Sequence, residues 1–452
     1  MLYRKIRSYI DDHFRSNEDK ILLIEGARQI GKSYIIRDVG TELYDNYVEI
    51  NFVEDDAGDK IFRNVRTTEE FYLNLSMVAG FKLDKYENTL VFIDEIQHYP
   101  QFLTMLKFLR QEHRYRFICS GSLLGIALKK TVSVPVGSII PKKMYQLDFE
   151  EFLIANDFGE DAIAHLRKSF EQKQPLAPEV HDKVLSLFKR YLLVGGMPDA
   201  VNEYLNSHNI VKVREAQESI RELYGVDASR YEEDAAKKLY IRRIYDMIPS
   251  QMENKKKRIV AKDILDRKGD RFSNYMEEFE YLINSGITIP SHAISNPKYP
   301  LAESRQKNLL KLYMNDVGML TSQLYHYNIQ PILNDIASIN LGSVYESAVA
   351  QELKAHYEKL FYYDNKQKGE VDFLVDDNGT MSVLLIEVKS GKDYTVHSAL
   401  DNLMAIQDYH IVSSIVLSNE REIKTKGNIL YLPIYHVMFL ENKVPEKENL
   451  YF

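Results

Sequence analysis

The sequence has 452 residues, of which 45% are hydrophobic and 27% are charged, and its formal net charge is −8. These values describe an ordinary globular protein with length for about three domains, and they exclude a chain that is a nucleic-acid-binding polycation throughout. The single cysteine, Cys119, excludes an internal disulfide framework and a cysteine-based zinc site.

A reducing compartment fits a chain with one cysteine, so we expect a cytoplasmic protein. No apolar run approaches the roughly 18 residues of a membrane-spanning helix. The N-terminal stretch MLYRKIRSYIDDHFRS lacks the long apolar core of a secretory signal. We therefore expect no membrane segment.

The first predicted elements are a helix over 4–14 and a buried strand over 21–25, followed by GARQIGKS at 26–33. This octet satisfies the phosphate-binding pattern G-x-x-x-x-G-K-[S/T]. Gly26 and Gly31 permit a tight turn whose N–H groups can surround phosphates. Lys32 supplies a charge for the β- and γ-phosphates, and the Ser33 hydroxyl suits Mg²⁺. The alternative is a glycine-containing turn that binds no nucleotide.

The strand–loop–helix context favours nucleotide binding, because the helix that follows aims its positive N-terminus at the same anions. The sequence therefore predicts an ATP site with Mg²⁺. Its nucleotide contacts are expected from Gly26, Ala27, Arg28, Gln29, Ile30, Gly31, Lys32 and Ser33.

A second apolar strand, predicted over 90–95 with the sequence LVFIDE, ends in two acids. Asp94 would hold the Mg²⁺ shell, and Glu95 would orient or deprotonate the attacking water. The alternative is a strand that ends in solvated carboxylates. Ser120 and Ser122 follow a strand over 115–119 and are candidates for contact with the γ-phosphate or its water, with an ordinary Ser-Gly turn as an equal alternative.

Other elements expected here are a strand over 47–52, helices over 67–81 and 101–112, a fifth strand over 144–147 and a helix from 149.

These motifs resemble those of the AAA+ ATPases. More narrowly, they are similar to a bacterial and archaeal group in which an AAA domain precedes a domain of unassigned function with a nuclease-like C-terminus. The resembling stretches are GARQIGKS, FIDEIQ at 92–97, CSGSLL at 119–124, YQLDFEEFL at 145–153, YLLVGGMPDAV at 191–201, LYMNDVGML at 312–320 and YESAVAQEL at 345–353. One departure concerns Gly137-Ser138, where family members often carry Gly-Arg; Lys142 and Lys143 follow it. No arginine acting on a neighbour's γ-phosphate is therefore assigned there.

The middle of the chain, from about 156 to 246, has a helical pattern that is broken at Gly195-Gly196-Met197-Pro198, which we interpret as a structural turn. Helices over 259–267 and 272–285 and a proline-bearing hairpin over 290–306 follow in an order that resembles a winged helix. A basic cluster in this region would meet DNA phosphates, although a solvated helix face is the commoner explanation of such a run. Its members are Lys255, Lys256, Lys257, Arg258, Lys262, Arg267, Lys268 and Arg271.

The C-terminal pattern is α-β-β-β-α-β, predicted as a helix over 342–355, strands over 360–363, 371–375 and 382–389, a helix over 396–407 and a strand over 411–417. Glu387 and Lys389 are two residues apart and share a sheet face, and Asp372 can face them from the paired strand. This resembles the PD-(D/E)XK nuclease core. Asp372, Glu387 and Lys389 match its D…ExK motif, and Glu346 matches its helical acid.

The resemblance implies a divalent metal held by Asp372 and Glu387, with Glu346 completing the site and Lys389 positioning or activating water. The alternatives are a solvated charge cluster, or a nuclease fold that is kept for binding after activity was lost.

The predicted fold class is α/β and comprises five regions. These are an AAA+-type P-loop domain with a parallel sheet (1–155), a helical region (156–245), a winged-helix-like region (246–335), a PD-(D/E)XK nuclease-like domain (336–443) and a tail (444–452) whose ENLYF resembles an expression-tag remnant. The favoured function is ATP binding and hydrolysis that controls DNA binding, with metal-dependent DNA cleavage as an added activity. The alternative is an ATP-dependent switch or scaffold that recruits a protein partner and carries an inactive nuclease fold. The sequence assigns no oligomeric state.

Overall fold

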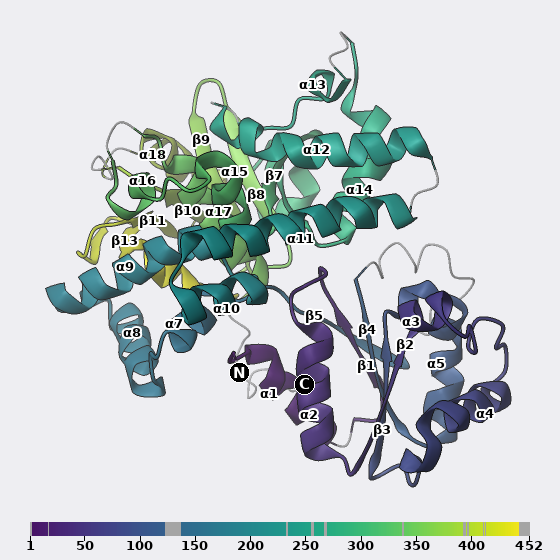
Figure 1. The fold of residues 1–452 in the computed structure, drawn as a ribbon. Coiled ribbons are helices and arrows are strands. Elements are labelled where there is room, and N and C mark those ends of the chain that lie inside the picture. The colour runs from purple at the N-terminus through teal and green to yellow at the C-terminus, as the bar shows by residue number, and fades with distance from the viewer. Residues whose placement is uncertain are drawn as a thin grey trace. The chain divides into compact units, whose positions relative to one another are not determined.

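The computed structural model describes residues 2–16, 18–122, 137–231, 234–254, 257–265, 269–336, 339–391, 395, 397–409, 411 and 413–442. The chain forms two compact units (Figure 1). The first comprises Met1–Gln146 with Asn284–Ile287, and the second comprises Leu147–Ile283 with Thr288–Phe452. In the described part of the chain, no helix combines the length and the apolar composition that crossing a bilayer requires.

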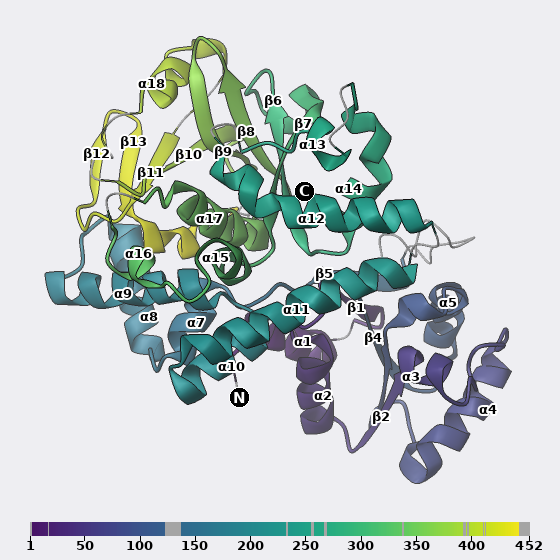
Figure 2. The same ribbon diagram turned by 45° about the horizontal axis from the view of Figure 1, so that its top comes forward.

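The first unit is built on a five-stranded parallel sheet with the order β2-β3-β4-β1-β5. Its central strands read as continuous apolar runs because helices cover both faces, with α1 and α2 on one side and α4 and α5 on the other (Figures 1 and 2). The elements are α1 Lys5–Arg15, β1 Ile21–Glu25, α2 Lys32–Leu43, β2 Asn46–Asn51, α3 Phe52–Ala57, α4 Thr68–Ala79, β3 Thr89–Asp94, α5 Gln101–Glu112, β4 Arg116–Gly121 and β5 Ile139–Lys143.

The fifth strand was expected over 144–147, and that expectation is wrong. The strand that pairs with β1 is β5, Ile139–Lys143. Met144 N donates one further hydrogen bond to the Glu25 carbonyl oxygen, and the strand ends before Met144. β5 is an edge strand that is partly exposed along its length, and it contains Pro141. An edge strand of this kind lacks the apolar run by which a buried strand is recognised in sequence.

The second unit contains an eight-stranded mixed sheet with the order β12-β13-β11-β10-β9-β8-β6-β7. Its helices are α7 Phe149–Ala155, α8 Glu160–Gln172, α9 Pro178–Val194, α10 Pro198–Ser207, α11 Ile210–Tyr231, α12 Ala235–Glu253, α13 Lys262–Leu265, α14 Met276–Asn284, α15 Val317–Tyr325, α16 Gln330–Leu333, α17 Gly342–His356 and α18 Ser398–Met404. Its strands are β6 Thr288–Ile294, β7 Arg305–Met314, β8 Leu360–Asn365, β9 Gly369–Asp377, β10 Ser382–Val388, β11 Ser413–Ser418, β12 Lys424–Lys426 and β13 Ile429–Pro433.

The hairpin expected over 290–306 corresponds to β6 and β7, which pair antiparallel. However, β6 also pairs in parallel with β8, from Ser291 opposite Leu360 to Ile294 opposite Tyr363. The hairpin is therefore the edge of the C-terminal sheet and not a free wing. The predicted boundary between the regions 246–335 and 336–443 therefore divides one continuous sheet. The helix expected over 259–267 is the four-residue α13, and 266–268 lie outside the described residues.

The motifs at 191–201 and 312–320 meet in a buried hub of the second unit. Asp316 accepts a hydrogen bond from Gly196 N (2.6 Å) at one oxygen and from Met319 N (3.0 Å) at the other. A Cβ on Gly195, whose φ is +72°, would lie 2.0 Å from Asp316 Oδ1. Gly195 is therefore required by the close approach of Asp316, and Gly196 by that of the Leu147 backbone, which explains the turn in structural terms.

The motifs at 145–153 and 345–353 complete the same hub. Glu352 Oε1 on α17 accepts hydrogen bonds from Phe149 N (2.9 Å) and from the Tyr191 hydroxyl (3.0 Å). Gln351 Oε1 accepts from Val317 N (2.8 Å), and Gln351 Nε2 donates to the Tyr191 hydroxyl (2.6 Å). These stretches hold α7, α9, α15 and α17 together, and each paired group avoids the cost of a buried polar atom without a partner.

Candidate functional site

The phosphate-binding loop connects the end of β1 to the start of α2. A Cβ on Gly26 would lie 2.3 Å from the Met144 carbonyl oxygen, and Gly31 has a φ of +90° at the N-terminus of α2. Both positions therefore need glycine. Lys32 is buried, and its Nζ donates to the carbonyl oxygens of Gly26 (3.0 Å) and Ala27 (2.8 Å). The ammonium group thus lies within the turn of the loop.

An arginine that the sequence analysis missed supports the same loop. Arg4 Nη1 donates to the carbonyl oxygen of Ile30 (2.8 Å), and Arg4 Nη2 donates to that of Tyr145 (2.5 Å). Gln29, between Arg28 and Ile30, has a φ of +63°. Arg4, the residue before α1, therefore connects the loop to the chain after β5. No local motif signalled this contact, because Arg4 is 26 residues from Ile30.

Two serines donate to Asp94 at the end of β3, Ser33 from the first turn of α2 and Ser120 from the end of β4. Ser33 Oγ donates to Asp94 Oδ2 (2.8 Å), and Ser120 donates to the other oxygen of the same carboxylate. The parallel register, with Ile93 opposite Cys119, brings Asp94 and Ser120 side by side. Burial raises the pKa of Asp94, and the hydrogen bonds from the two serines offset part of that rise. A hydroxyl beside a carboxylate is an oxygen donor set that suits Mg²⁺.

Glu95 follows β3 in a left-handed backbone conformation, with a φ of +53°. Gln97 Nε2 and Ser122 Oγ both donate to Glu95 Oε2, the latter at 3.3 Å, and Arg28 Nη2 lies 3.9 Å from the same oxygen. Burial favours a raised pKa for Glu95, but the charges of Lys32 and Arg28 outweigh it and hold the pKa below its usual value. The carboxylate is therefore ionised at neutral pH.

In the second unit, the structure brings Asp372, Glu387 and Lys389 together at the ends of β9 and β10. Asp372 Oδ2 accepts a hydrogen bond from Val388 N (2.9 Å), and Lys389 Nζ donates to Glu387 Oε1 (2.8 Å). Burial, followed by the charges of Glu387 and Glu346, raises the pKa of Asp372. Lys389 offsets part of the rise that burial causes in the pKa of Glu387.

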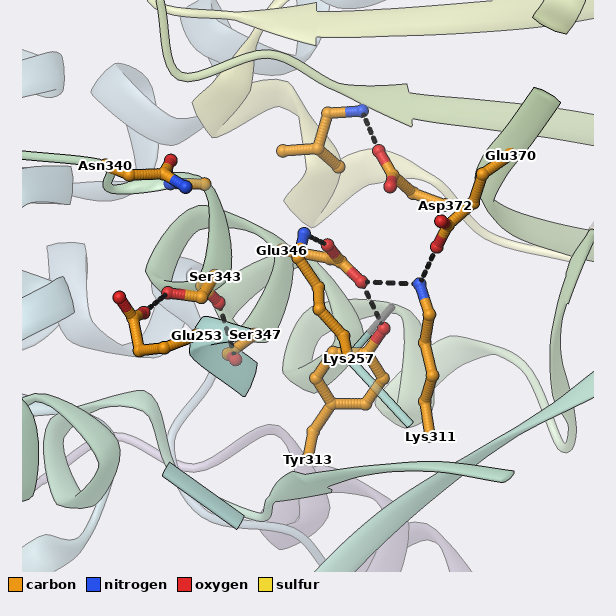
Figure 3. Close-up of polar contacts among 12 residues, drawn as sticks. Glu253, Lys257, Lys311, Tyr313, Asn340, Ser343, Glu346, Ser347, Glu370 and Asp372 are labelled. Atoms are coloured by element: carbon orange, nitrogen blue, oxygen red, sulfur yellow. Dashed lines mark hydrogen bonds and ion pairs between the residues drawn. The ribbon is translucent and has the colours of Figure 1, made fainter. Parts of the chain in front are cut away.

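Glu346, which the sequence analysis assigned to this metal site, accepts hydrogen bonds from side chains of the protein. Its Oε1 accepts from Lys311 Nζ (3.0 Å) and from the Tyr313 hydroxyl (2.5 Å), and its Oε2 accepts from Lys257 (Figure 3). Among the described residues, no three His, Cys, Asp or Glu side chains are grouped so that they could hold a metal ion. The ligand set Glu346, Asp372 and Glu387 therefore does not fit a divalent metal as it stands.

The basic cluster at 255–271 is only partly available to phosphates. Lys257 pairs with Glu346, and Arg258 pairs with Asp364. Lys262 and Arg271 are exposed, and Lys262 Nζ lies 4.0 Å from the neighbouring Asp263. The remaining predicted members, Lys255, Lys256, Arg267 and Lys268, lie outside the described residues. Two of the predicted cations thus neutralise carboxylates of the same unit.

Comparison with known families identifies the first unit. Residues 18–153 match the family described as AAA domain. Residues 185–327 and 341–437 match two domains of unknown function, DUF8612 and DUF4143. No curated protein matches the chain. The AAA match, together with the parallel sheet and the loop described above, makes the first unit an AAA-type P-loop ATPase domain.

Three solved structures show weak overall similarity. The Walker-type ATPase PABY2304 of Pyrococcus abyssi is 15% identical over 72% of this chain and 96% of its own, with a TM-score of 0.43. The Aeropyrum pernix ORC2 protein is 12% identical over 74% and 93%, with a TM-score of 0.36. The Thermotoga maritima RuvB Holliday junction branch migration motor is 13% identical over 64% and 89%, with a TM-score of 0.29. All three TM-scores lie below 0.5, so none of them carries an inference about this chain.

Proposed function

We propose that the chain binds ATP and hydrolyses it at the site between the phosphate-binding loop and the end of β3. The observation that carries the proposal is the hydrogen bond from Ser33 Oγ to Asp94 Oδ2, 2.8 Å long, because it joins the two motifs at the position where a nucleotide's cation is needed. Ser33 and Asp94 are the residues that would hold Mg²⁺. When bound, Mg²⁺ supplies Lewis-acid polarisation of the phosphate oxygens.

The other residues act on the phosphates and on water. Lys32 would exchange its acceptors, the carbonyl oxygens of Gly26 and Ala27, for charged phosphate oxygens, which are stronger acceptors. Glu95 is ionised, so it can orient a water molecule and take its proton as the water oxygen bonds to the γ-phosphorus and the bond to the ADP oxygen breaks. Ser122 and Gln97 hold the Glu95 carboxylate for this step.

Two substitutions separate binding from hydrolysis. Lys32→Ala should weaken ATP binding, whereas Glu95→Gln should bind ATP with near wild-type affinity and lose turnover by about 10²-fold or more. Glu87→Gln is the matched control, because Glu87 is an exposed glutamate of the same unit and carries no role in the site. Nucleotide binding and steady-state phosphate release are the measurements. Wild-type turnover in Glu95→Gln would remove its role, and unchanged ATP affinity in Lys32→Ala would overturn the site.

We further propose that the ATPase acts as a nucleotide-dependent switch whose second unit recruits a partner. Sequence reasoning favoured DNA as that partner, with cleavage as an added activity. The pairing of Glu346 with two lysines supports an inactive nuclease-like fold, and the pairing of Lys257 and Arg258 with carboxylates leaves fewer cations for DNA phosphates. We therefore place the alternative, a protein partner, first. DNA binding that weakens steeply with salt would distinguish the DNA-binding function from this one, because phosphate contacts release counterions.

A further inference from the structure

The carboxylate cluster of the second unit contains cations supplied by the protein. Lys311, on β7, has a side chain that is 0% exposed, and the side chain of Glu346 is 1% exposed. Lys311 Nζ lies 3.0 Å from Glu346 Oε1 and 2.7 Å from Glu370 Oε1, and Figure 3 shows both carboxylates turned toward it. A buried ammonium group is tolerated only when it is paired and hydrogen-bonded. Lys311 meets that condition with two carboxylates.

Lys257 supplies a second cation from the segment between α12 and α13. Its Nζ pairs with Glu346 Oε2, the oxygen that Lys311 does not contact, and its side chain is 20% exposed. With the Tyr313 hydroxyl at 2.5 Å from Oε1, both oxygens of Glu346 accept hydrogen bonds from residues outside α17. A divalent ion approaching Glu346 would have to displace these donors and would meet two like charges at close range.

The charges of the cluster are nearly balanced without metal. The carboxylates that the structure describes here are Glu346, Glu370, Asp372 and Glu387, and the ammonium groups are Lys257, Lys311 and Lys389. With all of these described groups ionised, one negative charge is in excess, and protonation of Asp372, whose pKa is raised, would remove it. The electrostatic need that a divalent cation meets in clustered carboxylates is thus largely met by side chains.

We propose that Lys311 and Lys257 take the place of metal cations in this cluster, so that it is an ionic core independent of divalent metal. The pairs join β7 and the segment before α13 to α17 and β9, which are elements from the two predicted regions 246–335 and 336–443. The cluster therefore connects the edge strand β7 to the inner strand β9. The proposal stands apart from ATP hydrolysis, since it concerns only residues of the second unit.

Removal of a lysine should create a metal site. The test uses the full chain without nucleotide in an Asp94→Asn background, which removes the metal ligand of the ATP site. Calorimetric titration with Mn²⁺ and thermal unfolding with Mn²⁺ or EDTA are the measurements. The parent should show no Mn²⁺ heat from the cluster, and its melting temperature should be the same in both solutions.

Lys311→Met should melt at a lower temperature in EDTA, because Glu346 and Glu370 lose their shared partner, and Mn²⁺ should recover part of that loss. Lys257→Met should show the same response with a smaller shift in melting temperature, since Lys257 is partly exposed. If Lys311→Met does not fold, Lys257→Met is the variant that tests the proposal. Lys262→Met is the matched control, because Lys262 belongs to the same basic segment but its side chain is 65% exposed, and it should gain no response to Mn²⁺.

Two results would overturn the proposal. One is a Mn²⁺ heat in the parent that Glu346→Gln abolishes, since Glu346 would then bind metal with the lysines present. The other is a folded lysine variant that gains no affinity for Mn²⁺, since the lysine would then not occupy a cation's place. Neither result bears on the Lys32 and Glu95 experiment, so the two proposals can fail separately.

Discussion

Glu95 is placed by its neighbours as much as by its own position in the sequence. Its left-handed backbone is uncommon for a residue other than glycine, and such conformations persist only where the surroundings hold them. Gln97 and Ser122 donate to one carboxylate oxygen, with Arg28 beside it. Gln97 is therefore a positioning residue for the proposed base.

Gln97→Leu tests that role. Without the amide, Glu95 should be less well oriented, so we expect kcat to fall by about tenfold or more while KM for ATP changes little. The Gln97 hydrogen bond lowers the pKa of Glu95, so its loss should move the acid limb of the kcat profile to higher pH. Steady-state kinetics across pH would measure both effects. A uniform loss of activity with an unshifted profile would mean that Gln97 serves folding alone.

Contacts distant in sequence are what residue patterns failed to predict. The motifs at 26–33 and 94–95 led to the groups that meet around Asp94, because fixed spacing on a strand, loop and helix fixes their geometry. Gln97 could have been noticed, since it stands two residues after Glu95 in FIDEIQ. Lys311, by contrast, pairs with Glu346 from 35 positions away, and no local pattern marks it. Residue patterns therefore gave no sign of the cation that faces Glu346.

Elements with strong local signals were located best. The helices expected over 101–112 and from 149 are α5 and α7, and α7 starts with a capping box in which Asp148 accepts from Glu151 N at 2.8 Å. β5, β12 and β13 were misplaced or not predicted. β12, with the sequence KTK, is exposed along its whole length, and β5 is an edge strand. The pairing of these two edge strands is determined by tertiary contacts, which residue patterns do not encode. β13, with the largely buried apolar sequence ILYLP, carries a local signal that the sequence analysis passed over.

The glycine turn between α9 and α10 gives a prediction for the hub. A Cβ on Gly196 would lie 2.0 Å from the Leu147 carbonyl oxygen, so Gly196→Ala must shift backbone, and we expect a loss of about 3 kcal/mol or more in unfolding free energy. Gly225→Ala is the control, because Gly225 lies in helix α11 with open space around its Cβ position. It should stabilise by up to about 1 kcal/mol. Denaturant unfolding would measure both, and equal effects would remove the steric explanation.

Across the described residues, several buried or half-buried histidines have lowered pKa values. Burial lowers the pKa of His13 in the first unit and of His181, His292 and His436 in the second. For His292 the pKa falls to about 4, and for His436, with His181 nearby, to about 3. The unfolded chain binds these protons near pH 6.5 and the folded chain does not. The contribution of these neutral histidines to the unfolding free energy is therefore fully present above pH 6.5, and it is lost as the pH falls toward their pKa values in the folded chain.

His436→Phe should weaken this acid sensitivity. The His436 ring lies 5.7 Å from that of Phe170 and 6.2 Å from that of Phe439, and neither of its nitrogens has a hydrogen-bond partner among the described residues, so phenylalanine can replace it without stranding a donor. A pKa lowered to about 3 corresponds to about 2 kcal/mol lost between pH 7.5 and pH 5. Melting temperatures at these two pH values should differ less in the variant than in the wild type.

Because buried carboxyls such as Asp316, whose pKa is raised to about 6, act in the opposite direction in both proteins, the comparison isolates His436. An equal drop in both proteins would show that His436 does not contribute to acid unfolding.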